Sequence, residues 1–424
     1  MPNLFKRHQR QQGRHTPNLW PVGVVAPLAL LIMGGLAFGL YLGMGALLTV
    51  ESATSKPVSV QDIVKTTVTV LTLIGAVLAA LYAYRKQLLE EGSSHRADAA
   101  HLAERYAKAA EQLGHDQAAV RLAGVYAMAR LADDWPEQRQ VCINVLCAYL
   151  RMPYEADSTA AGFKEGEREV RRTIIRTIRD RLQDPASSVT LCGVDLDFTG
   201  ATFDGGDFNG ATFTGGRISF QDATFVTDAL SFHDATFSGG TVSFNRATFS
   251  GGTVSFFSAT FAGSTAFFTG MRFIGGAVSF PSATFSGGLV HFSNSTLSQG
   301  QVSFGDATFN GSRVYFSRSR FTDSEVSFDG ATFSGGSVSF GAATFSGAAV
   351  FFNDAIFSGG TVAFRGATFT GSAVSFDAAT FSGGTISFHD TTFADSQVSF
   401  TCPRIHPAVS IEWGPLPALP VNQP

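Results

Sequence analysis

The stretch Ala235-Thr-Phe-Ser-Gly-Gly-Thr-Val-Ser-Phe-Asn-Arg246 is the repeating unit of this chain, because variants of it recur every 12 residues up to Phe400. Ahead of this region, four phenylalanines follow one another every five residues: Phe198, Phe203, Phe208 and Phe213. After them the spacing alternates between seven and five, with one lapse at Leu297. Self-similarity at a short fixed period indicates stacked structural repeats.

Each repeat contains two short segments in which Ala or Val, then Thr or Ser, then Phe follow in order. Alternate residues of a strand point to opposite faces, so we expect Phe and the residue two before it to face inward. Pairs such as Gly239-Gly240 predict corners with positive φ. Aspartates such as Asp222 and Asp234 predict hydrogen-bonded turns.

The period is compatible with a coil of 12 residues or of 24. At a step of 24, the large outward residues Phe267, His291 and Tyr315 fall in one series, whereas the interleaved series is serine. A coil of 12 residues also leaves little room for stacked phenylalanine rings. We therefore favour the 24-residue coil.

The amino-terminal part predicts a membrane anchor. Residues 1–18 are basic, and an uncharged apolar run follows from about Trp20 to Val50. A second apolar run, Ile63 to Tyr84, carries only Lys65. Each exceeds the roughly 20 residues that cross a bilayer, and the first is too long for a cleavable signal peptide. We expect a two-helix transmembrane hairpin over residues 19–84.

Basic residues flank both ends of this hairpin, while its connecting loop holds one Glu and one Lys. The positive-inside rule then predicts a cell-membrane protein with two spans and both termini in the cytoplasm. Each span has small residues four apart, a pattern that allows close helix packing in lipid. These residues are Gly35, Gly39 and Gly43 in the first span, and Gly75, Ala79 and Ala83 in the second. The stripes fit either the two spans packing on each other or a homodimer.

Residues 85–184 predict a helical module. We expect helices over Ala99 to Leu113, from an Asp116 cap to Leu131, from Pro136 to Leu150, and over Glu167 to Gln183. The third would turn Val141, Val145 and Tyr149 inward. The last has Val170, Ile174, Ile178 and Leu182 on one side and six arginines on the other: Arg168, Arg171, Arg172, Arg176, Arg179 and Arg181. Interleaved acids favour a solvated arginine face over a lipid or nucleic-acid contact.

Three segments of this module carry a resemblance: Arg105-Tyr-Ala-Lys-Ala-Ala-Glu-Gln-Leu-Gly114, Ala119-Val-Arg-Leu-Ala-Gly-Val-Tyr-Ala-Met-Ala-Arg-Leu-Ala132 and Val145-Leu-Cys-Ala-Tyr-Leu-Arg151. They resemble the helical module of membrane-anchored bacterial pentapeptide-repeat proteins. The resemblance implies a right-handed quadrilateral parallel β-helix, which we expect over residues 190–402, with a Pro-rich tail or cap over 403–424. Residues 196–215 follow the pentapeptide spacing, and later units add two residues per pair.

No catalytic, cofactor or metal motif stands out. The sequence has no G-x-S-x-G, no G-x-x-x-x-G-K-[ST] and no G-G-x-G-x-D repeat. The four cysteines form no C-x-x-C pair, and Cys142 and Cys147 are expected as buried thiols. We therefore expect a non-enzymatic protein without a cofactor.

One surface feature interrupts the Ser/Thr coat. In a 24-residue coil, five residues would form a candidate protein-binding patch: Phe267, Leu289, His291, Arg313 and Tyr315. Arg272, Arg318 and Arg320 would lie nearby. Aromatic residues with arginine are the usual composition of binding hot spots, although drift on an unconstrained surface would also explain them.

The leading hypothesis is a membrane-anchored scaffold whose rod binds an unidentified protein partner. DNA mimicry directed at gyrase is an alternative, but residues 190–404 carry 15 acids and 8 arginines, 8 − 15 = −7, which is sparse for it. Nucleic acid is likewise not expected as a partner. A lattice- or polysaccharide-binding surface built from outward threonines is a third alternative, and it would require an extracellular rod.

Overall fold

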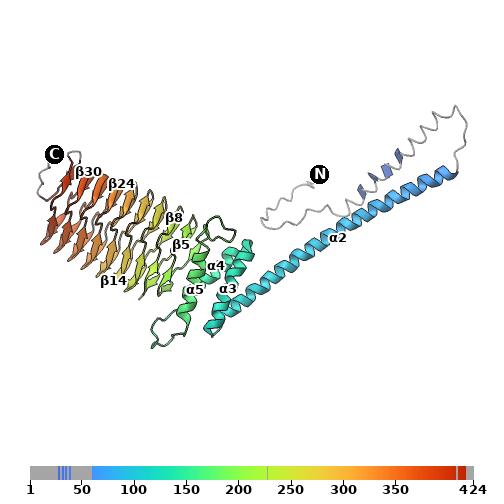
Figure 1. The fold of residues 1–424 in the computed structure, drawn as a ribbon, viewed down its shortest axis with the longest axis horizontal. Helices are drawn as coiled ribbons and strands as arrows, with labels where there is room; N and C mark the ends of the chain where they lie inside the picture. The colour runs from blue at the N-terminus through green and yellow to red at the C-terminus, as the bar shows by residue number, and fades with distance from the viewer. Residues whose placement is uncertain are drawn as a thin grey trace, which may run out of the picture. The chain divides into compact units, whose positions relative to one another are not determined.

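The computed structural model describes residues 27–28, 31–32, 34–35, 38–39, 60–226, 228–406 and 409–416. The chain divides into two compact units, residues 1–104 and 105–424, drawn in Figure 1. The predicted basic tail and most of the first predicted span, Gly43 included, lie outside the described residues.

The main described element of the first unit is helix α2 (Val60–Leu113), 54 residues long. It continues past Tyr84 without a break, so residues 99–113 are helical as predicted but form the end of α2 and not a helix of their own. Among the described residues, Val68–Gln87 is the one segment long and apolar enough to cross a membrane, by length and composition. Its 20 residues would span about 30 Å.

The small-residue stripes have no packing partner among the described residues. A Cβ added at Gly35, Gly39 or Gly75 would meet no heavy atom within 4 Å. Ala79 and Ala83 are exposed. Their role in helix packing stays a prediction.

The second unit begins at Arg105 with the last turns of α2. The helical module continues with α3 (Ala118–Asp134), η1 (Pro136–Gln138), α4 (Arg139–Leu150) and α5 (Glu167–Asp180). Gln117 is the N-cap of α3, not Asp116, and no side chain caps it. Pro136 opens η1 as predicted for a first helical position.

The inward face of α4 differs in part from the predicted one. Val141 is 43% exposed, whereas Tyr149 is buried as predicted, and Cys142 and Cys147 are buried as expected. Burial raises the pKa of Cys147 to about 12, which keeps this thiol protonated. All four cysteines are free.

A parallel β-solenoid of right-handed type follows, with about nine coils of about 24 residues. Its short strands form four rows, each strand pairing with the strand one coil away (Figure 1). The first row contains β1 (Leu196–Asp197), β5 (Arg217–Ser219), β9 (Thr241–Ser243), β13 (Thr265–Phe267), β17 (Leu289–His291), β21 (Arg313–Tyr315) and, farther on, β34 (Ser410–Glu412). The second contains β2 (Thr202–Phe203), β6 (Thr224–Phe225), β10 (Thr248–Ser250), β14 (Arg272–Ile274), β18 (Thr296–Ser298), β22 (Arg320–Thr322), β25 (Thr344–Ser346), β28 (Thr368–Thr370) and β31 (Thr392–Ala394).

The other two rows complete the coil. The third contains β3 (Gly206–Asp207), β7 (Leu230–Ser231), β11 (Thr253–Ser255), β15 (Ala277–Ser279), β19 (Gln301–Ser303), β23 (Glu325–Ser327), β26 (Ala349–Phe351), β29 (Ala373–Ser375) and β32 (Gln397–Ser399). The fourth contains β4 (Thr212–Phe213), β8 (Thr236–Ser238), β12 (Thr260–Ala262), β16 (Thr284–Ser286), β20 (Thr308–Asn310) and β33 (Arg404–Ile405). Three longer strands turn the corner from the fourth row into the first: β24 (Thr332–Ser339), β27 (Ile356–Ala363) and β30 (Thr380–Ser387).

The pairing register settles the coil length. Thr248 pairs with Arg272 and Thr265 with Leu289, so residues 24 apart stack directly and the 12-residue coil is excluded. The first coil is shorter, because Leu196 pairs with Ile218. Its sides follow the uninterrupted five-residue spacing.

The phenylalanines form four columns inside the solenoid, as the alternation predicts. Within a column the rings lie parallel; Phe280 and Phe304 are 4.8 Å apart with an interplanar angle of 5°. Rings of opposite columns meet edge to face, as Phe292 and Phe304 do at 5.8 Å and 90°. Both arrangements are favourable for aromatic rings, so the columns stabilise the coil stack without metal or disulfide.

The corners use positive φ at two kinds of position. Gly240 has φ +67°, and a Cβ there would meet the Gly216 carbonyl oxygen at 2.6 Å. Asp222, Arg246 and Ala342 occupy a left-handed corner position with φ of 55°, 57° and 54°. The sequence predicted these aspartates as hydrogen-bonding turn residues. Their second property is that aspartate tolerates the left-handed conformation that the corner requires.

At the carboxyl end, β33 and β34 pair with β30. Trp413 packs edge-on against Phe400, with ring centroids 5.5 Å apart. Residues up to 416 thus cover part of the last coil.

Candidate functional site: an aromatic row flanked by arginines

Three outward aromatic residues stack on the first row of strands, and we call them the aromatic row: Phe267, His291 and Tyr315. They end β13, β17 and β21 and pair in direct register. Phe267 and His291 have ring centroids 5.5 Å apart with an interplanar angle of 9°. His291 and Tyr315 are 5.2 Å apart at 25°. The parallel register therefore brings together three predicted patch residues that are 24 apart in sequence.

The other two predicted patch residues lie on the same strands. Leu289 pairs with Arg313. These two residues lie two positions before His291 and Tyr315 and therefore on the same outward face of the strands. Leu289 is half-buried, and Arg313 is exposed. All five residues thus form one continuous area of the first row.

The stacking of the aromatic row determines which atoms a partner can touch. Both faces of His291 are covered, one by Phe267 and one by Tyr315. The ring edges remain toward solvent, and aromatic edges carry the positive end of the ring quadrupole. Burial lowers the pKa of His291, so its imidazole is neutral at pH 7.

Four arginines flank the aromatic row, and with it they form what we call the basic band. Arg313 lies on the first row of strands, Arg272 and Arg320 lie on the second, and Arg318 occupies the corner between them with φ 58°. All four are exposed. No ion pair or side-chain hydrogen bond joins any of them to another described residue, so their charges are available to a partner.

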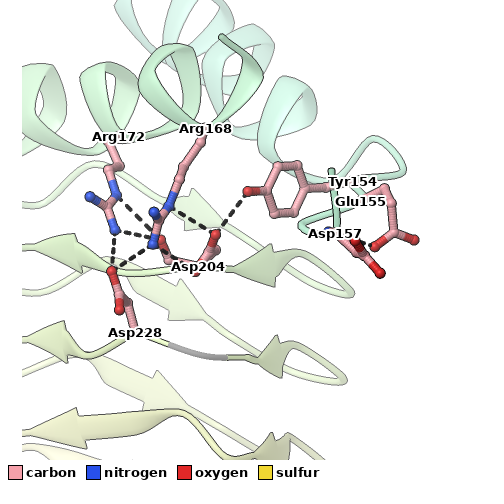
Figure 2. A network of polar contacts seen from close by, with 7 residues as sticks. All are labelled: Tyr154, Glu155, Asp157, Arg168, Arg172, Asp204 and Asp228. Carbon is pink, nitrogen blue, oxygen red and sulfur yellow. Dashed lines mark hydrogen bonds and ion pairs between the residues drawn. The ribbon is translucent and has the colours of Figure 1, made fainter. Parts of the chain in front are cut away.

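A second polar cluster joins α5 to the first coils (Figure 2). Arg168 Nε lies 2.9 Å from Asp204 Oδ2, and Arg168 Nη2 lies 2.6 Å from Asp228 Oδ2. Arg172 Nη2 lies 2.5 Å from the same Asp228 oxygen. The Tyr154 hydroxyl donates to Asp204 Oδ2 at 2.9 Å. Part of the arginine face of α5 therefore contacts the first coils, which the predicted solvated face did not foresee, while Arg168 and Arg176 remain exposed.

The backbone of the first coil admits this approach because of a glycine. Gly205 has φ +81°, and a Cβ there would meet Arg172 Nη2 at 2.7 Å. Arg171 is buried and donates to the Thr202 carbonyl at 3.0 Å. Burial and the hydrogen bond to Asp204 raise the pKa of Tyr154 to about 12, so this phenol stays a donor.

An open groove beside this cluster is lined by Arg172, Arg176, Arg179, Asp207 and Asp228. Carboxylates neutralise its cations: Arg179 contacts Asp207, and Arg176 lies 3.7 Å from Glu169. Matched charges make this a cap on the first coil rather than an anion site. Within the described part of the chain, no group of three or more His, Cys, Asp or Glu side chains could hold a metal.

Sequence reasoning placed the residues of the basic band together, but it assigned the arginine face of α5 to solvent instead of to the carboxylates of the first coils. The signal was present, because Arg168, Arg172 and Arg179 recur on one helix face while Asp204, Asp207 and Asp228 follow in the first coils. Only their distances distinguish that pairing from a solvated face.

The chain is thus a parallel β-solenoid with coils of about 24 residues and a small helical module, consistent with pentapeptide repeats. No protein-family model matches the chain, and no curated protein matches it.

Proposed function

We propose that the chain is a non-enzymatic, membrane-anchored scaffold whose solenoid binds proteins through the basic band. The observation that carries the proposal is the stack of Phe267, His291 and Tyr315, flanked by unpaired arginines, on a surface that is otherwise mainly Ser and Thr.

Physical reasons favour this area over the rest of the solenoid surface. Serine and threonine side chains offer little apolar area, whereas fully burying an aromatic side chain contributes about 1.5–3 kcal/mol. Arginine adds a planar donor that binds carboxylates in two places at once. Aromatic and arginine side chains are the residues most enriched among interface hot spots.

The membrane part of the proposal rests on composition. Val68–Gln87 is long enough to span a bilayer. Lys and Arg flank both ends of the predicted hairpin, and its connecting loop has few of them. We propose two spans, with the solenoid in the cytoplasm. Protease treatment of intact cells should then leave the solenoid uncut, whereas its removal would contradict this topology.

The binding role is tested by chemical crosslinking in membranes followed by purification of the chain. Phe267→Ser combined with Tyr315→Ser should remove partners that the unsubstituted protein retains. Phe257→Ser is a matched control, because Phe257 is also exposed (43%) but lies at the corner after the third row of strands. An unchanged set of partners in the double variant would refute the proposed role of the aromatic row.

A further inference from the structure

The charged residues of the middle coils separate onto opposite sides of the solenoid. Between residues 247 and 353 there are four arginines and four acids. The arginines, those of the basic band, lie on the first and second rows of strands and the corner between them. The acids lie on the third row and on the corners at its two ends, and we call them the acidic side: Asp306, Asp323, Glu325 and Asp329.

The two charged sides are diagonally opposed at the same height. Arg318 follows Phe316 at the corner between the first and second rows, and Asp306 follows Phe304 at the corner between the third and fourth. Asp329 follows Phe328 at that same corner one coil later. Within these coils the solenoid is therefore polarised across its width, with equal numbers of opposite charges.

The basic band is suited to a partner that presents carboxylate groups. Bases and sugars bind proteins by lying on aromatic faces, but both faces of His291 are taken up within the aromatic row. The exposed ring edges are positive, like the arginines beside them. Carboxylate groups suit such a surface, and a Ser/Thr face carrying carboxylates is what the acidic side of this chain presents.

We infer that the basic band docks against the acidic side of a second copy of this chain. This inference rests on the proposed function, since it names one partner of the proposed binding surface. Copies anchored in the same membrane would place their middle coils at the same height, which brings Arg313, Arg318 and Arg320 of one level with the four acids of the next. Arg272 lies two coils before Arg320.

The charge pattern also determines the symmetry of the contact. A two-fold axis would place the same surface of both copies in contact, and here that would oppose arginines to arginines. A head-to-tail contact leaves one basic band and one acidic side free at its ends. The copies should therefore add one after another into open rows, not stop at a dimer.

The test uses a charge exchange in the purified full-length chain. One variant reverses the basic band (Arg313→Glu, Arg318→Glu, Arg320→Glu), and a second reverses the acidic side (Asp306→Arg, Asp323→Arg, Glu325→Arg). Arginine suits the left-handed corner at Asp306, because Arg246 and Arg318 occupy such positions with φ 57° and 58°. Sedimentation equilibrium in density-matched detergent reports the mass of the protein.

The unsubstituted chain should form species larger than dimers at about 0.05 M salt and lose them at about 1 M, where the Debye length is only about 3 Å. Each variant alone should associate at least about 10-fold more weakly, a free-energy change near 1.4 kcal/mol. An equimolar mixture should regain association, because each variant then meets its complement. Regain in the mixture also demonstrates that both variants are folded. Arg404→Glu, on the fourth row, is a control that should leave association unchanged.

Two results would overturn the inference. One is an unsubstituted chain whose association does not depend on salt. The other is an equimolar mixture of the two variants that associates no more strongly than each variant alone. Binding of poly-L-glutamate or single-stranded DNA by a chain that stays monomeric would assign the band to another anion. Failure here differs from failure of the scaffold proposal, because the crosslinked partners could still depend on Phe267 and Tyr315.

Discussion

Removing one ring from the centre of a phenylalanine column tests how the solenoid is stabilised. Phe304 is fully buried and stacks between Phe280 and Phe328, at 4.8 and 4.9 Å. It also meets Phe292 and Phe316 edge to face, at 5.8 and 6.1 Å. Phe304→Ala removes all of these contacts and leaves a cavity between three coils.

The expected cost follows from this burial. Truncating a fully buried phenylalanine costs about 3–5 kcal/mol. Phe400 provides the comparison, because it is half-buried at the end of the same column, with Phe376 at 4.9 Å and Trp413 at 5.5 Å. With roughly half of the 1.5–3 kcal/mol transfer term and no enclosed cavity, Phe400→Ala should cost about 1–2 kcal/mol.

Guanidinium denaturation followed by circular dichroism measures both costs. Each coil contacts only its neighbours, so a break at Phe304 should also uncouple the coils on either side. Hydrogen exchange should then show lost protection centred on β19 rather than at the ends. Equal costs for Phe304→Ala and Phe400→Ala would refute the reasoning that column burial determines stability.

Three further changes test other features of the solenoid. Leu297→Phe should restore the missing ring of its column and raise the free energy of unfolding by about 1 kcal/mol; a lower melting temperature would contradict this. Ala342→Gly should stabilise by about 0.5–1 kcal/mol, because Ala342 has φ 54° and a left-handed non-glycine residue is costly. Denaturation of Ala343→Gly, at a buried position beside it, should show no such gain. The pKa of Asp377 is lowered by the Ser399 hydroxyl, so its contribution is present above the normal Asp pKa and is lost as pH falls through the lowered value. Asp377→Asn should therefore lose less stability between pH 6 and about pH 2.5 in urea titrations, and an equal loss would contradict the assignment.

The sequence predicted the solenoid because in a stacked fold the repeat period is the pairing register. Phe267, His291 and Tyr315 could be placed in contact from a step of 24 alone, since every coil has the same length in that region. The inward phenylalanines followed from the two-residue alternation of strands. Such inferences need only local spacing.

Contacts made by residues outside the repeats could not be predicted in this way. The arginine face of α5 has the same pattern whether water or Asp204 and Asp228 lie opposite it, and only the packing of the helix on the first coil distinguishes the two. Likewise, Val141 has helical spacing but lies on the exposed side of α4, because the position of α3 and α5 determines which side is covered.

The coil, its phenylalanine columns and the aromatic row thus follow from the sequence, since they depend on distance along a regular chain. Folding placed the arginines of α5 against the carboxylates of the first coils and set the arginines and acids of the middle coils on opposite sides. Alternation along a strand turns every charged side chain outward, but it does not say which of the four sides of the coil that side chain occupies. A carboxylate such as Asp306 acquires its position relative to Arg318 only when the chain has turned two corners of the coil.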